Sequence, residues 1–321
     1  MNILLTSAGR RVSLLRAFQD VAHPRGMKVF VAEMDPLAPT VHLADRAFRV
    51  PHVTAPDYIP ELLSIVETQA ISLIVPTIDT ELPVLANHAS AFHARGARPL
   101  ISSAEFVRIC GDKWRTYQSF LEAGVAVPAS WLPPDFTTDM PDALFLKPRD
   151  GSASAHTYPC TLADLNQRLL MVPNPIVQEH LKGEEITIDA LLDFQGNPVH
   201  YVPRTRIRTL GGESIQGVTL PEPDLDAWLE VVLATSGELG ARGPITLQCF
   251  RTARGPVLTE INPRFGGGFP LARAAGGDYP SWLLAHLAGE EFDLSLGHYR
   301  RGLYMTRAYC ETFTEDLPWS R

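Results

Sequence analysis

The sequence predicts a mixed α/β and α+β protein, with a parallel-sheet unit at the N-terminus and units richer in antiparallel strands after it. Over the first hundred residues, apolar runs of strand length alternate with runs of helical spacing. Further along, two pairs of strand-like runs are each joined by a short turn-like segment. A length of 321 residues also exceeds one ordinary core, which favours two or three domains. We expect these domains at 1–104, 105–180 and 181–321.

The N-terminal unit alternates between strand-like and helix-like runs. Val12, Leu15 and Phe18, for example, have the spacing of one helix face. We expect strands at 2–6, 28–32, 71–76 and 99–102, and helices at 12–21, 58–69 and 82–96. Strands that alternate with helices form a parallel sheet that is covered on both faces.

Polar residues at the carboxyl ends of these strands are candidate substrate contacts, because parallel sheets bind ligands at that edge. These candidates are Ser7, Asp35, Thr80 and Glu81. The segment 7–11 after the first strand lacks the G-x-G-x-x-G pattern, which argues against a nicotinamide dinucleotide site. An anion bound at the N-terminus of the following helix remains an alternative.

The second unit mixes helices and strands, and the third unit is richer in antiparallel strands. In the second, we expect helices at 112–122 and 162–170, strands at 144–148 and 175–179, a proline-rich connector at 131–141 and a small, polar loop at 149–155. In the third, we expect antiparallel strands at 185–192 and 199–202, a long helix at 225–239 and a hairpin formed by 245–250 and 257–262.

Composition argues against two classes of partner. Lys and Arg total 28 against 36 Asp and Glu, which gives a net charge of −8. We therefore expect neither nucleic acid nor a membrane surface as a partner. No apolar run approaches the roughly 18 residues that span a bilayer. The four cysteines lie far apart without a CxxC pair, which is typical of reduced thiols and favours a cytoplasmic protein.

The last hairpin gathers three side chains that carry oxygen ligands. If 253–255 is a three-residue loop centred on Arg254, Gln248 faces Glu260. Glu260 and Asn262 then share a face, because side chains alternate along a strand. Carboxylate and amide oxygens suit Mg²⁺, which keeps water and phosphate oxygens as further ligands. The pattern predicts a magnesium site, with an ordinary polar strand face as the alternative.

Three cations are placed where they could contact phosphates. Lys147 ends an apolar strand just before the small, polar loop, and Lys113 lies near a helix start. Arg264 follows Asn262 by two residues and carries a forked guanidinium that can bind a phosphoryl group. For the two lysines, the alternative is an ordinary water-exposed position.

A linker separates the second unit from the third. A short apolar strand stops near Glu179, and an extended segment follows through His180 and Leu181. Backbone groups that no strand pairs there could bond the edge of an adenine ring. Glu185 opens the next strand and could accept hydrogen bonds from ribose hydroxyls.

Five motifs, taken in order, resemble the ATP-grasp superfamily. They are Asp112-Lys113, Phe145-Leu146-Lys147-Pro148, Gln178-Glu179-His180-Leu181-x-Gly183-x-Glu185, Gln248, and Glu260-Ile261-Asn262-Pro263-Arg264. The closest likeness is to the carbamoyl-phosphate synthase large-subunit group and its small stand-alone carboxylate–amine ligase relatives. Segments 5–11 and 76–82 are also similar to the stand-alone group, so the resemblance covers nearly the whole chain.

The resemblance implies a Rossmann-like N-terminal (pre-ATP-grasp) domain followed by a two-lobed ATP-grasp fold. It implies that Lys113 and Lys147 hold the phosphates of ATP, that Glu179–Leu181 is the adenine hinge and that Glu185 binds ribose. The loop at 150–156 would close over the phosphates.

The resemblance also implies the metal ligands and the catalytic residues. Gln248, Glu260 and Asn262 would hold one or two Mg²⁺ ions, with Mn²⁺ as an alternative, and Glu260 would bridge them. Arg264 would stabilise the phosphoryl group in transfer, with Lys147 as the second catalytic residue.

The implied activity is an ATP-dependent ligase that turns a carboxylate into an acylphosphate, which an amine or similar nucleophile then attacks. Arg204, Arg206 and Arg208 have strand spacing and would form one face for the carboxylate, although a solvated edge strand has the same pattern. Other interpretations are a carbamoyl-phosphate-type or kinase-like enzyme and a nucleotide-binding regulator without turnover. Relatives are often dimers, which leaves a homodimer open.

Overall fold

The structure is a computed structural model that describes residues 1–137, 139–151, 156–210, 213–290, 296–317 and 319. The expected fold class is confirmed. One sheet is entirely parallel and two are entirely antiparallel, in the order along the chain that the sequence predicts. Within the described residues, no helix is both long and apolar enough to cross a membrane.

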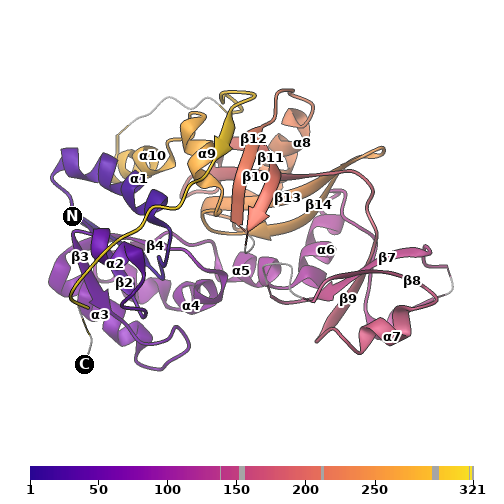
Figure 1. Cartoon of the computed structure of the whole chain (residues 1–321), viewed down its shortest axis with the longest axis horizontal. Coiled ribbons are helices and arrows are strands. Elements are labelled where there is room, and N and C mark those ends of the chain that lie inside the picture. Colours follow the sequence, from indigo (N-terminus) through magenta and orange to yellow (C-terminus); the bar gives the residue numbers. More distant parts are fainter. Residues whose placement is uncertain (138, 152–155, 211–212, 291–295, 318, 320–321) are drawn as a thin grey trace.

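The N-terminal unit is a five-stranded parallel sheet in the order β3-β2-β1-β4-β5 (Figure 1). Its strands are β1 (Asn2–Thr6), β2 (Val29–Glu33), β3 (Arg46–Arg49), β4 (Ile71–Pro76) and β5 (Arg98–Pro99). Its helices are α1 (Val12–Ala22), α2 (Pro39–Leu43), α3 (Tyr58–Gln69) and α4 (Leu82–His93). The sequence did not predict β3 and α2, and β5 is shorter and earlier than the expected strand.

Strand β1 is buried on both faces, which explains why its sequence is continuously apolar. Ile3 and Leu5 belong to a core that extends into the C-terminal sheet. Leu4, on the opposite face, packs into a separate core beneath α3 and α4. The N-terminal unit and the C-terminal sheet therefore share one continuous hydrophobic core.

The smallest unit is a four-stranded antiparallel sheet in the order β6-β9-β7-β8, with a core of its own around Leu144 and Val177. Its elements are β6 (Ser130–Trp131), β7 (Ala143–Pro148), β8 (Tyr158–Thr161), α7 (Leu165–Leu169) and β9 (Pro175–Glu179). Before it come α5 (Ala104–Gly111) and α6 (Lys113–Glu122), which pack on β14 of the C-terminal sheet. The sequence did not predict α5.

The C-terminal sheet has six antiparallel strands in the order β14-β13-β10-β11-β12-β15. They are β10 (Glu184–Leu192), β11 (Pro198–Leu210), β12 (Glu213–Thr219), β13 (Gly243–Thr252), β14 (Gly255–Asn262) and β15 (Tyr304–Thr306). The helices of this unit are α8 (Asp226–Glu238), α9 (Phe269–Ala274) and α10 (Tyr279–Ala288). Strand β11 is much longer than expected, since it pairs with both β10 and β12.

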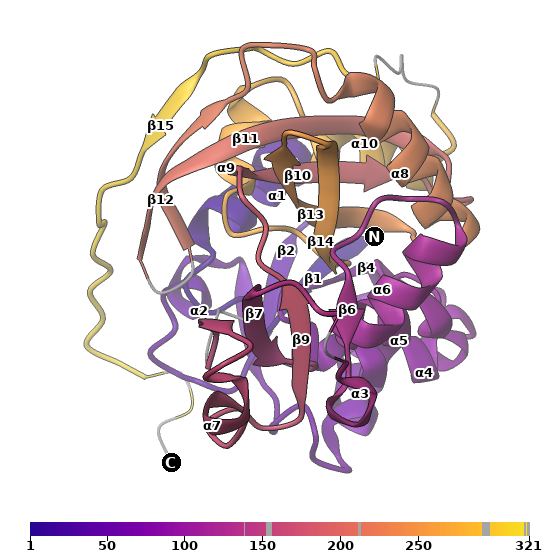
Figure 2. The same ribbon diagram turned by 90° about the vertical axis from the view of Figure 1, so that its right-hand side faces the viewer.

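The three sheets lie in the three units expected at 1–104, 105–180 and 181–321, whose exact boundaries stay a prediction. Helix α1 packs against α9 and α10, which joins the N-terminal unit to the C-terminal sheet. Turned by 90°, the molecule shows the small sheet with β7 and β9 in front of the parallel sheet and below the C-terminal strands (Figure 2).

Candidate active site

The hairpin β13–β14 pairs Gln248 with Glu260, as the sequence predicts, although the expected loop is wrong. Thr252 pairs with Gly255, so the loop has two residues rather than three. The register then shifts by one residue between Gln248 and Cys249, which restores the expected partner of Gln248. Thr259 is the extra residue of this β-bulge.

The bulge decides which way Glu260 faces. Leu258 pairs with Cys249, and both side chains are buried in the core. In a regular strand, Glu260 would point to the same side as Leu258. Because the bulge at Thr259 reverses the alternation, Glu260 instead lies beside Gln248, on the open face of the sheet.

The three hairpin side chains fit a magnesium ion. Gln248 Nε2 donates to Glu185 Oε1 at 2.9 Å, and Asn262 Nδ2 donates to Glu260 Oε1 at 3.1 Å. Because the amide N–H groups are held by carboxylates, both amide oxygens are left as acceptors. The described residues contain no group of three His, Cys, Asp or Glu side chains that could hold a metal. A set with one carboxylate and two amides suits Mg²⁺, which takes phosphate and water oxygens as well.

Two cavities meet at this hairpin. The first chamber has a volume of about 570 Å³ and is lined by Lys147, His180 and Phe250 among others. The second chamber has a volume of about 440 Å³ and is lined mainly by polar residues. Arg206, Gln248 and Glu260 line both chambers. Two of the predicted metal ligands, Gln248 and Glu260, thus stand at the boundary between a more apolar space and a more polar one.

Lys147 lies in the first chamber at the end of β7, and its side chain is almost fully buried. Burial lowers the pKa of this ammonium to about 8, against the opposing effect of Glu260. Nearby Lys113 lowers it further and Glu185 raises it. Burial of an ammonium costs free energy because it removes water from the charge. A buried lysine therefore indicates a position where an anion is expected.

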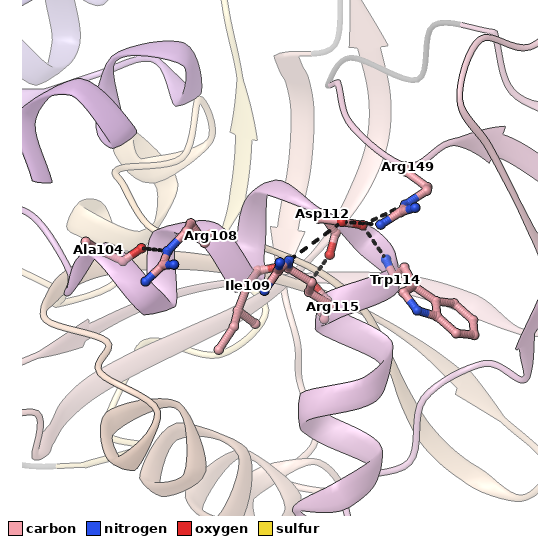
Figure 3. A network of polar contacts seen from close by, with 8 residues as sticks. Ala104, Arg108, Ile109, Asp112, Trp114, Arg115 and Arg149 are labelled. Atoms are coloured by element: carbon pink, nitrogen blue, oxygen red, sulfur yellow. Dashed lines mark hydrogen bonds and ion pairs between the residues drawn. The ribbon is translucent and has the colours of Figure 1, made fainter. Parts of the chain in front are cut away.

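Lys113 is held beside Lys147 by a clamp between α6 and the end of β7. Asp112 caps α6 through Trp114 N at 2.9 Å, and its two carboxylate oxygens accept from Arg149 at 3.2 and 2.6 Å (Figure 3). The hydrogen bonds from Arg149 hold the pKa of the Asp112 carboxyl below its ordinary value despite partial burial. Lys113 Nζ in turn donates to Gly151 O at 3.0 Å. The loop from 150 to 156 that was expected to close over phosphates lies partly outside the described residues.

Arg264 lies in the second chamber and is held by the N-terminal unit. Its Nη2 donates to Asp79 Oδ2 at 2.6 Å, and its side chain is only 13% exposed. Asp79 follows β4, so an N-terminal carboxylate positions a guanidinium that belongs to the metal-site hairpin. No local pattern in the sequence indicates this ion pair.

Two parts of the chain match known protein families. Residues 3–100 match a family model described as PylC-like, N-terminal domain. Residues 171–306 match a model described as ATP-grasp in the biosynthetic pathway with Ter operon. Residues 171–306 therefore belong to an ATP-grasp family. The expected resemblance is confirmed at this level, and the finer likeness to carbamoyl-phosphate synthase stays a prediction. No curated protein sequence matches significantly.

Solved structures share the fold of this chain at low sequence identity. One is the biotin carboxylase domain of 2-oxoglutarate carboxylase from Hydrogenobacter thermophilus, bound to MgADP, ADP and bicarbonate: 16% identity, TM-score 0.71, 94% of this chain and 73% of that one. Another is L-amino acid ligase from Bacillus licheniformis, at 17% identity and a TM-score of 0.68. The match covers 88% of this chain and 73% of that one. A third is N5-carboxyaminoimidazole ribonucleotide synthetase from Thermotoga maritima, at 16% identity and a TM-score of 0.67. The match covers 93% of this chain and 78% of that one.

The expected adenine hinge is only partly free in this ATP-grasp chain. Glu179 N donates to Ala129 O at 2.9 Å and His180 N donates to Ala143 O at 3.0 Å, so these groups are occupied. Leu181 N has no hydrogen-bond partner within the described residues. The rings of His180 and Phe145 are stacked with centroids 6.2 Å apart, which adds an aromatic wall to the first chamber.

Glu185, expected at the ribose, is occupied by neighbouring side chains. Its Oε1 accepts from Gln248 at 2.9 Å and from Arg206 Nη2 at 2.6 Å. It lines the first chamber, where ribose binding stays a prediction. Glu185 also orients two of the residues that line both chambers.

Arg204 is placed in the second chamber as part of a buried ion pair. It donates to Asp189 at 2.7 Å, and both side chains are about 2–3% exposed. A Cβ on Gly268 would lie 2.2 Å from the Arg204 guanidinium, and one on Gly266 would lie 2.6 Å from Asp189. The glycine run after β14 is therefore required by the close approach of this pair.

Of three further expected substrate contacts, two lie away from both chambers and one lines both. Glu81 is fully buried and accepts from Tyr58 Oη, and it lines neither chamber. Arg208 is exposed and lies on the opposite face from Arg206, because the register of β11 shifts between them. Arg206 does line both chambers.

Among the four strand-end candidates, Thr80 lines the second chamber, whereas Ser7 and Asp35 line neither chamber in the described structure. The sequence also missed residues of this chamber. Arg11 and Glu213 both line it. The Arg-Arg pair after β1 was a signal for Arg11, but only the packing of α1 on the C-terminal unit brings it to the site.

Proposed function

We propose that this chain is an ATP- and Mg²⁺-dependent ligase that joins a substrate carboxylate to an amine. The carrying observation is that Arg206, Gln248 and Glu260 line both chambers. A nucleotide in the first chamber and a carboxylate in the second would therefore meet at one hairpin face. The fold it shares with an L-amino acid ligase and a carboxyaminoimidazole ribonucleotide synthetase supports carboxylate activation.

ATP occupies the first chamber in this proposal. Lys147 and Lys113 contact its phosphates, and Leu181 N–H donates to the adenine edge. The apolar wall that includes Phe145 and Phe250 covers the base. The lysine charges and the backbone donor are already positioned, so binding requires little reorganisation.

Gln248, Glu260 and Asn262 would hold Mg²⁺, and the ion would supply neutralisation of part of the phosphate charge. Mn²⁺ satisfies the same ligands. Glu260 is the one carboxylate of this set, so its removal is the most informative change to the site.

The reaction needs positioning and charge neutralisation more than covalent help from the protein. A carboxylate oxygen of the substrate forms a bond to the γ-phosphorus, the bond from that phosphorus to the β-phosphate oxygen breaks, and ADP leaves. Arg264, held by Asp79, neutralises the oxygens of the phosphoryl group in transfer. The amine then attacks the acyl carbon, phosphate leaves and the amine gives up a proton.

Phosphate release tests this proposal directly. The full chain is incubated with MgATP and a panel of carboxylates, with and without amines, and phosphate and ADP are measured. Hydroxylamine is added in a parallel series, because it converts an acylphosphate to a stable hydroxamate. We expect phosphate release that needs both substrates, and hydroxamate formation when hydroxylamine replaces the amine.

Glu260→Gln should lower turnover by about 100-fold or more, because it removes the carboxylate of the metal site. Glu222→Gln is the control, since Glu222 is exposed and lines neither chamber. Full activity of Glu260→Gln would refute the metal assignment. A stable phosphorylated product that accumulates without an amine would instead indicate a kinase-like enzyme.

A further inference from the structure

Two arginines from different units converge on one carbonyl oxygen at the edge of the second chamber. Arg11 Nη1 donates to Phe265 O at 3.0 Å, and Arg264 Nη1 donates to the same oxygen at 3.1 Å. Two guanidinium groups that share one acceptor repel each other, more strongly where water is excluded. Burial, and next the charge of Arg264, lower the pKa of Arg11 to about 10.

The carboxylates nearby are already engaged by other arginines. Asp79 accepts from Arg264 at 2.6 Å. Glu213 pairs with Arg10 at 3.6 Å and with Arg307 at 3.4 Å. Three arginines thus share two carboxylates, and a fourth, Arg11, has no carboxylate partner among the residues that the structure describes. This end of the chamber carries an excess of positive charge.

A small recess opens beside the second chamber at this point. It has a volume of about 40 Å³ and shares Arg11, Glu213, Gly266 and Gly267 with the chamber wall. A space of this size holds a group of only a few atoms, since one water already needs about 10–15 Å³ measured in this way. A carboxylate is a group of that size.

The second chamber also contains buried polar atoms that the protein leaves unpaired. Arg264 Nε, Arg204 Nη1 and Thr187 Oγ1 have no hydrogen-bond partner within the described structure, and all three residues line the chamber. An unpaired buried donor costs about 1–3 kcal/mol. These unpaired atoms lie in the wall of the chamber that Arg11 also lines.

We propose that the substrate of the second chamber is a dicarboxylate: one carboxylate is activated at the Glu260 hairpin, and the other is bound by Arg11 at the recess. The assignment of the first carboxylate rests on the proposed function. The substrate class comprises short aliphatic dicarboxylates and acidic amino acids. A monocarboxylate would leave the charge of Arg11 without a partner.

Binding of matched ligands tests the proposal without any need for turnover. Calorimetry on the full chain, saturated with MgADP, compares succinate, glutarate, L-aspartate and L-glutamate with their monoamides and with a phosphorylated monocarboxylate. We expect at least one dicarboxylate to bind about tenfold or more tightly than its monoamide, as the loss of one charged hydrogen-bonded pair predicts.

The same titrations on Arg11→Gln should abolish this preference while the affinity for MgADP changes by less than about twofold. Arg11→Lys keeps the positive charge but loses the forked guanidinium, so it should retain part of the preference for the dicarboxylate. This variant replaces the glutamine variant if that one does not fold. Arg16→Gln is the control, because Arg16 is exposed on helix α1, which begins directly after Arg11.

Equal binding of acids and monoamides, an unchanged preference in both Arg11 variants, preferential binding of the phosphorylated ligand, or no binding across the panel would each overturn the proposal. None of these outcomes depends on phosphate release. A failure of the dicarboxylate assignment is therefore distinguishable from a failure of the ligase proposal, which phosphate release and hydroxamate formation test.

Discussion

Arg264 donates a 2.6 Å hydrogen bond to Asp79, a residue 185 positions earlier in the chain. The pair joins the end of the β13–β14 hairpin in the C-terminal unit to the carboxyl end of β4 in the parallel sheet. Because Arg264 is 13% exposed and Asp79 is 32% exposed, the pair is partly shielded from solvent. It makes the N-terminal unit a part of the candidate active site rather than a neighbouring domain.

Asp79→Asn should therefore lower kcat, because the amide retains an acceptor but loses the charge that orients Arg264. We expect a loss of about five- to twentyfold, with the KM for ATP changed by less than about twofold. Steady-state kinetics over both substrates separate the two constants. Asp57→Asn is the control, since Asp57 is exposed and makes no capping hydrogen bond. A change in the KM for ATP alone would contradict the positioning role.

ATP affinity should fall as the pH rises through about 8. The pKa of buried Lys147 is lowered to about 8, so the ammonium that attracts phosphate is lost above that pH. In Lys147→Arg the cation stays charged across this range, so the affinity should be nearly independent of pH between 7.5 and 9. Calorimetric titration with MgADP at several pH values measures this. A wild-type affinity that is flat over the range would refute the role of Lys147.

Glu81 should make the protein less stable as the pH rises. Burial raises the pKa of its carboxyl from the ordinary 4.5 to about 7. A raised pKa in the folded state gives a contribution to stability that is present below about pH 4.5 and is lost as the pH rises through about 7. Glu81→Gln does not titrate, and its amide can still accept from Tyr58.

The free energy of unfolding of Glu81→Gln relative to wild type should therefore rise by about 2–3 kcal/mol between pH 4.5 and pH 8. Urea denaturation at the two pH values measures the difference. Exposed Glu61 on α3 supplies the control, and Glu61→Gln should show little dependence on pH. A difference between Glu81→Gln and wild type that stays constant with pH would contradict the assignment.

Gly268→Ala should destabilise the fold, because the new methyl would lie 2.2–2.5 Å from the guanidinium atoms of buried Arg204. Moving Arg204 would strain its pair with Asp189, so we expect a loss of about 1–3 kcal/mol. Gly111→Ala meets no atom within 4 Å and has an ordinary φ, so it should be neutral or slightly stabilising. Thermal denaturation compares the two. Equal melting temperatures would show that the glycine run is not needed for this contact.

Much of the fold could be predicted because its signals are local. Helix α3 and strands β1, β4 and β9 have the predicted bounds, since each is a continuous apolar or periodic run that ends at a polar or turn-forming residue. Strand β3 and helix α2 were missed because they are short and lie at the sheet edge. Strand β12 was missed because its mixed polar sequence has no clear alternation.

The candidate site could likewise be predicted only in part from the sequence. The pairing of Gln248 with Glu260 was predicted from the turn, although its correct register depends on a bulge at Thr259 that no local pattern indicates. Arg208 was placed wrongly because a second register shift reverses its face. Alternation alone predicts the face of a strand residue only while the strand pairs regularly.

By itself, the sequence determined the order of the sheets, the residues of the hairpin and the motifs of an ATP-grasp chain, because periodicity, turns and residue chemistry are written locally. Only the tertiary structure decided that Glu81 is buried, that Asp79 holds Arg264 and that Arg11 reaches the same carbonyl as Arg264. Those contacts join residues from units that are far apart in the chain. They depend on how α1 and the parallel sheet pack against the C-terminal unit, which no local signal specifies.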